Sequence, residues 1–195
     1  MIDFANGLSG MIVLSGSPLV INKSVALEET KGAALGVSGG GVSRVFDISP
    51  GVGLSIHGLT LTDGNAAGGG AVRVNGGSLS LEDSLVSDST STGLGGGIYS
   101  IGGMITLDNT TVADNRAAGD GGGVYADGGS VVIRSSTLGG NEAGTGGTGQ
   151  GADYLSGTER PSLCRIPSSA TTPPRPFRTA RTPFARVVRS TRPTV

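Results

Sequence analysis

Residues 69–94 read GGAVRVNGGSLSLEDSLVSDSTSTGL, residues 95–120 read GGGIYSIGGMITLDNTTVADNRAAGD, and residues 121–146 read GGGVYADGGSVVIRSSTLGGNEAGTG. The three stretches align without a gap, so the chain repeats with a period of 26 residues. A fixed period of this size is typical of stacked repeat architectures, in which each repeat contacts only its neighbours. The repeat therefore predicts the fold class before the role of any single residue is considered.

Four positions of the repeat are apolar in all three copies. Two of them are separated by one residue, and an apolar period of two indicates a strand with one buried face. Many of these residues are β-branched, which favours strand over helix. The four apolar columns are Val72, Ile98 and Val124; Leu79, Ile105 and Val131; Leu81, Leu107 and Ile133; and Val86, Val112 and Leu138.

Paired glycines divide each repeat into about three short strands. Glycine supplies the positive φ angles that sharp corners need. It also opposes a helix, because each interior glycine costs about 1 kcal/mol. The pairs stand at 69–70, 95–96 and 121–122, and again at 76–77, 102–103 and 128–129.

These features predict an all-β fold, a right-handed parallel β-helix of about six coils over residues 1–158. Strands of successive coils would pair in parallel about 4.8 Å apart, and parallel crossovers are almost always right-handed. Antiparallel hairpins would need two-residue turns between longer strands. The pattern is clearest over residues 69–146 and extends upstream at an offset of 25, where matching residues are Leu54 with Leu79, Ile56 with Leu81, and Leu61 with Val86.

The net charge of −1 hides two different parts of the chain. Residues 1–154 hold 6 Lys/Arg and 14 Asp/Glu, whereas residues 155–195 hold 8 Arg, no Lys and one acid. Seven of the nine prolines also lie in the second part. We therefore predict that residues 159–195 form a disordered Arg/Pro-rich tail after the solenoid.

Three interpretations of this tail remain open. It could be a basic arm that binds nucleic acid or an anionic surface, or a Pro/Thr-rich linker to a wall anchor. It could also be a frameshift artefact, which the absence of lysine and the break in mid-repeat favour. No nucleic-acid partner is expected unless the tail is genuine.

Cysteine and hydropathy limit the class of protein further. The solenoid has no cysteine, and Cys164 is the only one in the chain, so a disulfide within the chain is excluded. No stretch reaches the roughly 18 apolar residues of a transmembrane helix. The chain shows no signal peptide and begins almost at its first repeat, so we expect a fragment of a longer protein.

The glycine elements resemble a known repeat family. GGAV (69–72), GGGI (95–98) and GGGV (121–124) resemble the GGA-[ILV] element of polymorphic outer-membrane-protein repeats. VADN (112–115) and LGGN (138–141) resemble the companion F-x-x-N element, with an aliphatic residue in place of Phe.

A longer stretch resembles bacterial parallel β-helix proteins of the pectate-lyase-like superfamily, namely RVFDISPGVGLSIHGLTLTDGNAAGGGAV at residues 44–72. IDFANGLSGMIVL (2–14) resembles the segment immediately after the CSLREA motif of one secreted group, although the motif itself is missing. The resemblance covers roughly residues 2–158. It implies a secreted or surface-displayed bacterial protein with an adhesive or carbohydrate-associated role.

Two outward columns carry the candidate functional residues. Arg73, Tyr99 and Tyr125 could bind sugar faces or acidic glycans, or they could simply stack between strands. The second column holds His57, Glu82, Asp108 and Arg134. Asp108 and Arg134 are the catalytic candidates there, although a column that mixes residue types is also a way for a surface to limit like-charge stacking.

No resident metal or cofactor is expected. Calcium needs six to eight oxygen ligands, and the stacked pair Asp88 and Asp114 does not provide them. The remaining candidate carboxylates are Asp83, Asp120 and Asp127. At a corner, Ser89, Asn115 and Asn141 share a column that we interpret as a structural ladder between coils.

The sequence thus favours a non-catalytic stalk or adhesin, secreted or on the bacterial cell surface, that binds a polysaccharide or host-surface glycan. The alternative is a polysaccharide lyase or glycoside hydrolase acting on uronate polymers. The oligomeric state does not follow from the sequence.

Overall fold

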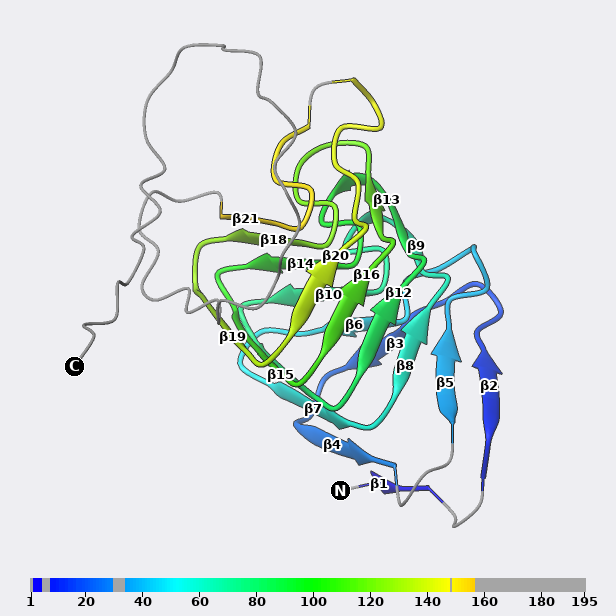
Figure 1. The fold of residues 1–195 in the computed structure, drawn as a ribbon. Helices are drawn as coiled ribbons and strands as arrows, with labels where there is room; N and C mark the ends of the chain where they lie inside the picture. Colours follow the sequence, from blue (N-terminus) through cyan, green and yellow to red (C-terminus); the bar gives the residue numbers. More distant parts are fainter. Residues whose placement is uncertain (1, 5–7, 30–33, 148, 157–195) are drawn as a thin grey trace, which may run out of the picture.

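The computed structural model describes residues 2–4, 8–29, 34–147 and 149–156. These residues form an all-β parallel solenoid of about five turns and contain no helix (Figure 1). The predicted fold class is therefore confirmed. The predicted tail at residues 159–195 lies outside the described residues. Within the described part of the chain, no helix is long and apolar enough to cross a membrane.

Three six-stranded parallel sheets form the walls of the solenoid, and a short fourth sheet adds to one side. Sheet A contains β1 (Ile2–Asp3), β4 (Val25–Glu28), β7 (Gly53–His57), β11 (Ser78–Glu82), β15 (Met104–Asp108) and β19 (Ser130–Arg134). Sheet B contains β2 (Gly10–Val13), β5 (Leu35–Ser38), β8 (Thr60–Thr62), β12 (Leu85–Ser87), β16 (Thr111–Ala113) and β20 (Thr137–Gly139). Sheet C contains β3 (Leu19–Ile21), β6 (Phe46–Ile48), β10 (Val72–Asn75), β14 (Ile98–Ile101), β18 (Val124–Asp127) and β21 (Tyr154–Ser156). Sheet D contains β9 (Asn65–Gly68), β13 (Thr90–Leu94) and β17 (Arg116–Ala117).

Strand register confirms the four apolar columns. In sheet C, Val72 pairs with Ile98, which pairs with Val124. The offset of 25 upstream is also correct, because Leu54 pairs with Leu79 in sheet A. All members of the four columns are buried in one core except Leu138, which is partly buried and packs against it. The interior of the tube is therefore filled by stacked aliphatic side chains.

The corner column forms the predicted ladder between coils. The Asn115 side-chain oxygen accepts a hydrogen bond from the Ser89 backbone N–H at 3.1 Å, and Asn141 does the same for the Asn115 N–H at 3.0 Å. The Asn115 amide also donates to the Val86 carbonyl at 3.0 Å and to the Asn141 side-chain oxygen at 3.0 Å. The three ladder side chains are buried, so each one supplies hydrogen bonds that water cannot reach.

Two features were not predicted. Sheet D gives the middle coils a short fourth strand, where the sequence indicated about three. In the last coil, Tyr154 pairs with Val124 and Leu155 pairs with Tyr125. Tyr154 stands 29 residues after Tyr125, three more than the 26-residue period. It therefore joins the apolar column of Val124 and packs against the core.

The first coil, which contains β2 and β3, exposes several large apolar side chains. Ile12 and Leu19 occupy interior columns, paired with Val37 and Phe46, yet they are 44% and 41% exposed. Val13 and Val20 point outward and are 62% and 59% exposed. Both faces of this coil are therefore accessible to solvent.

Candidate functional site

The first candidate column runs along the outer face of sheet C. Register places Arg73 beside Tyr99 and Tyr99 beside Tyr125, as the sequence predicts. The two tyrosine rings have centroids 5.7 Å apart and are tilted by 50° to each other. This tilted arrangement is one that aromatic pairs prefer, and both side chains are half-buried.

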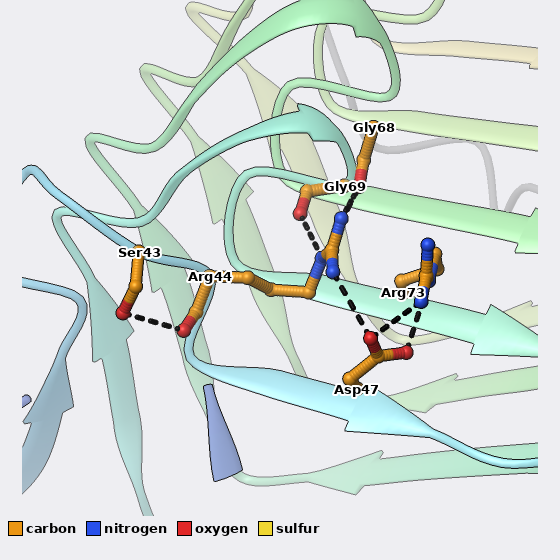
Figure 2. A network of polar contacts seen from close by, with 6 residues as sticks. All are labelled: Ser43, Arg44, Asp47, Gly68, Gly69 and Arg73. Carbon is orange, nitrogen blue, oxygen red and sulfur yellow. Dashed lines mark hydrogen bonds and ion pairs between the residues drawn. The ribbon is translucent and has the colours of Figure 1, made fainter. Parts of the chain in front are cut away.

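The column continues upstream into a charged network that the sequence interpretation missed. Arg73 donates from Nε and Nη2 to the two carboxylate oxygens of Asp47, at 2.9 and 2.5 Å. Asp47 also accepts a bond from Nη1 of Arg44 at 3.2 Å, so it lies between two guanidinium groups (Figure 2). Asp47 pairs directly with Arg73 in register, and extending the column by one period would have found it.

Arg44 is held in a buried cradle of backbone oxygens. Its Nε donates to the Gly69 carbonyl at 2.9 Å, and its Nη2 donates to the Gly68 carbonyl at 2.5 Å (Figure 2). Burial lowers the pKa of the Arg44 guanidinium, while Asp47 opposes that shift by favouring the charged form. Two arginines therefore share one aspartate on one side of the tyrosine pair, while the negative charges of Asp127 and Asp120 act on the pair as well.

The tyrosine hydroxyls are held in their neutral form. Burial raises the pKa of Tyr99 and of Tyr125 above the ordinary value of 10.0, and the charge of Asp127 raises both further. Arg73 acts in the opposite direction on Tyr99. At neutral pH both rings therefore present hydrogen-bonding hydroxyl groups.

These shifts predict late ionisation of the tyrosine pair. A Tyr154→Phe protein retains Tyr99 and Tyr125 as its only tyrosines. Both phenols should ionise with midpoints above pH 10, because the pKa of each is raised in the folded state. The stability that the neutral phenols contribute is fully present below pH 10 and is lost as pH rises through the folded values. Ultraviolet absorbance of the phenolate against pH measures this. Midpoints at or below those of the denatured chain would contradict it.

The second candidate column runs along the outer face of sheet A. Register places His57, Glu82, Asp108 and Arg134 in one row, as predicted, and adds Glu28 beside His57. Asp108 and Arg134 are neighbours in this row. A shallow hollow of about 350 Å³ lies on the same face, over β4, β7 and β11, and is lined mainly by small residues such as Ser55, Ser78 and Ser80.

Where the strands of sheet A end, residues at the corners make further contacts that the alternation within a strand does not predict. His57 Nε2 lies 3.0 Å from Oδ2 of Asp83, and the Asn109 side-chain amide donates a hydrogen bond to Oδ1 of Asp83. Asp83 and Asn109 have φ angles of 49° and 46°, so their side chains leave the alternation of the strands. The sequence pattern indicates Asp83 only as a candidate carboxylate and does not predict where it lies.

The stacked acids Asp88 and Asp114 lie at another corner. Asp88 and Asp114 follow paired residues of β12 and β16 and share positive φ angles of 52° and 56°, as does Asp63 one coil earlier at 49°. A shallow, polar hollow of about 420 Å³ is lined by Asp63, Asp88 and their neighbours.

Comparison with known proteins gives no further assignment. No family model, no curated protein and no solved structure matches this chain. The candidate functions therefore depend on the residues themselves.

Proposed function

We propose that this chain is a segment of a secreted or surface-displayed bacterial β-solenoid that serves as a non-catalytic stalk or adhesin. The repeat elements that resemble polymorphic outer-membrane-protein repeats and CSLREA-type pectate-lyase-like proteins support this assignment. A stack of parallel coils gives an extended, rigid support with repeated outward columns. Such a support suits display of a binding surface better than enclosure of a small substrate.

The outer face of sheet C is the proposed glycan-binding surface, and the Tyr99–Tyr125 pair is the observation that carries the proposal. Two half-buried rings offer apolar area next to free hydroxyl groups, a combination that favours contact with the mixed surface of a sugar. Arg73 stands beside them, fixed by Asp47. The Arg73 side chain is partly exposed, and a guanidinium in that position favours polysaccharides that carry carboxylate groups.

Direct binding tests this proposal. The full-length chain should bind at least one polysaccharide from a panel of neutral and uronate-containing polymers. Replacing both rings, Tyr99→Ala with Tyr125→Ala, should weaken that binding at least about tenfold, because loss of two aromatic contacts removes the main apolar area. Isothermal titration or glycan-array fluorescence measures the effect.

A matched control separates binding from folding. Ser80 and Thr106 are also outward neighbours in register, but on sheet A. The Ser80→Ala, Thr106→Ala protein should retain full affinity. Absence of binding across the whole panel, or equal loss in the control, would contradict the assignment to sheet C.

The alternative function is a polysaccharide lyase or glycoside hydrolase acting on uronate polymers. The specific observation in its favour is that Asp108 and Arg134 are register neighbours on the outer face of sheet A. Release of unsaturated or reducing sugar ends that falls in Asp108→Asn or Arg134→Ala proteins would replace the binding proposal.

A further inference from the structure

Three metal-ligating side chains from neighbouring coils converge where β7 and β11 end. The donor atoms of His57, Glu82 and Asp83 all lie within 4.8 Å of one another. His57 and Glu82 are partners in strand register, and Asp83 is the corner residue that follows Glu82. We propose that these three residues form a binding site for one divalent transition-metal ion of the zinc class, although the sequence led us to expect no metal.

The spacing of the donors fits a tetrahedral ion. Zinc binds imidazole nitrogen at about 2.0–2.1 Å and carboxylate oxygen at about 2.0–2.2 Å, so two ligands of one tetrahedral ion lie roughly 3.3 Å apart. His57 Nε2 and Asp83 Oδ2 are already 3.0 Å apart. Glu82 is exposed, so its side chain, which is longer than that of aspartate, can supply a carboxylate oxygen as the third ligand. Water would take the fourth.

Asp83 is oriented by a neighbour that leaves one of its oxygens for the ion. The Asn109 amide donates to Oδ1 of Asp83, while Oδ2 faces His57. Residues that hydrogen-bond to a metal ligand in this way fix its direction and affect metal affinity. The site thus has two ligands in place and a positioning residue behind one of them.

The surrounding charge also favours a cation. Glu28 lies beside His57 in the sheet A column, and Asp108 lies beside Glu82. Like charges on adjacent strands repel, and Glu82 and Asp108 are such a pair. Arg134 is one coil further along. A bound dication would therefore relieve repulsion among four carboxylates.

The imidazole decides which cation the site prefers. Calcium and magnesium take oxygen ligands, whereas zinc and its neighbours accept histidine nitrogen together with carboxylate oxygen. The site lies on sheet A and does not include the tyrosine pair of sheet C. Its existence is consequently independent of the proposed glycan binding.

Titration of the tag-free full-length chain with zinc tests the proposal. A Cys164→Ser background removes the only thiol, and His57 is the only histidine in the chain. We expect one-to-one zinc binding, measured by isothermal titration and by competition with a chromophoric chelator. His57→Gln should weaken binding at least about tenfold, and Asp83→Asn should do the same, because each removes a ligand.

Two further variants make the result specific. Asn109→Gly keeps a residue that accepts positive φ, as Gly58 does at the equivalent corner two coils earlier, and should weaken zinc binding about tenfold if Asn109 positions Asp83. Asp114→Asn removes an acid in the same conformation at another corner and should leave affinity unchanged. Zinc binding that survives His57→Gln, or calcium binding of equal strength, would show only a generally acidic surface and overturn the proposal, as would no zinc binding.

Discussion

Gly96→Ala should lower the free energy of unfolding by about 4 kcal/mol, or prevent folding altogether. A Cβ at this position would lie against the Gly122 carbonyl oxygen and only 2.6 Å from the Arg116 backbone nitrogen and carbonyl carbon. These are backbone atoms of neighbouring segments, so no side chain can rotate away to make room. Chemical denaturation followed by circular dichroism measures the loss.

Gly139→Ala is the matched control. An added Cβ would meet nothing within 4 Å, and the φ angle of Gly139 is not positive. Its register partner in the previous coil is Ala113, so the column already accepts a methyl group. This protein should be as stable as the unaltered chain, and a large loss here would mean that glycine content, rather than coil-to-coil contact, governs stability.

Asn115→Ala should cost about 3 kcal/mol, the second largest effect expected of a single substitution. The change leaves the buried Ser89 N–H without its partner and removes the donor to the Val86 carbonyl. A buried polar group that loses its only partner costs about 1–3 kcal/mol. Denaturation midpoints, compared at equal transition slopes, measure the effect.

Two further substitutions interpret that result. Asn115→Ser introduces the residue that already stands at this position in the previous coil, so its cost should be smaller than that of alanine. Asn75→Ala alters an exposed asparagine at the end of β10 and should change stability by less than about 0.5 kcal/mol. Equal effects of Asn75→Ala and Asn115→Ala would contradict a ladder that holds the coils together.

Most of the fold could be predicted because two periods agree. The alternation within a strand directs Leu79 and Leu81 inward, and the 26-residue period places Ile105 and Leu107 directly beside them. The position of each column therefore follows from two independent patterns, the alternation within a strand and the period between coils. The outward columns follow from the same arithmetic, which is why Tyr99 and Tyr125 were correctly placed side by side.

The contacts at corners could not be predicted in this way. Asp83 and Asn109 adopt positive φ angles, where alternation no longer gives the direction of a side chain. The buried position of Arg44 depends on backbone carbonyls 24 and 25 residues later, whose orientation a sequence pattern does not contain. Similarly, the longer last coil shifts Tyr154 into the core because the loop before it does not keep the period.

The regular register of the middle coils has a consequence for the gene as well as for the protein. Gly95 and Gly121 begin equivalent coils, and strands β10, β14 and β18 pair in one unbroken register. Removing the codons for residues 95–120 would bring Val124 beside Val72, with every column still matched. Unequal recombination between the repeats can therefore shorten or lengthen the array by whole coils while the reading frame and the packing both survive. Length variation in whole repeats is thus the form of inherited change that this architecture tolerates most readily.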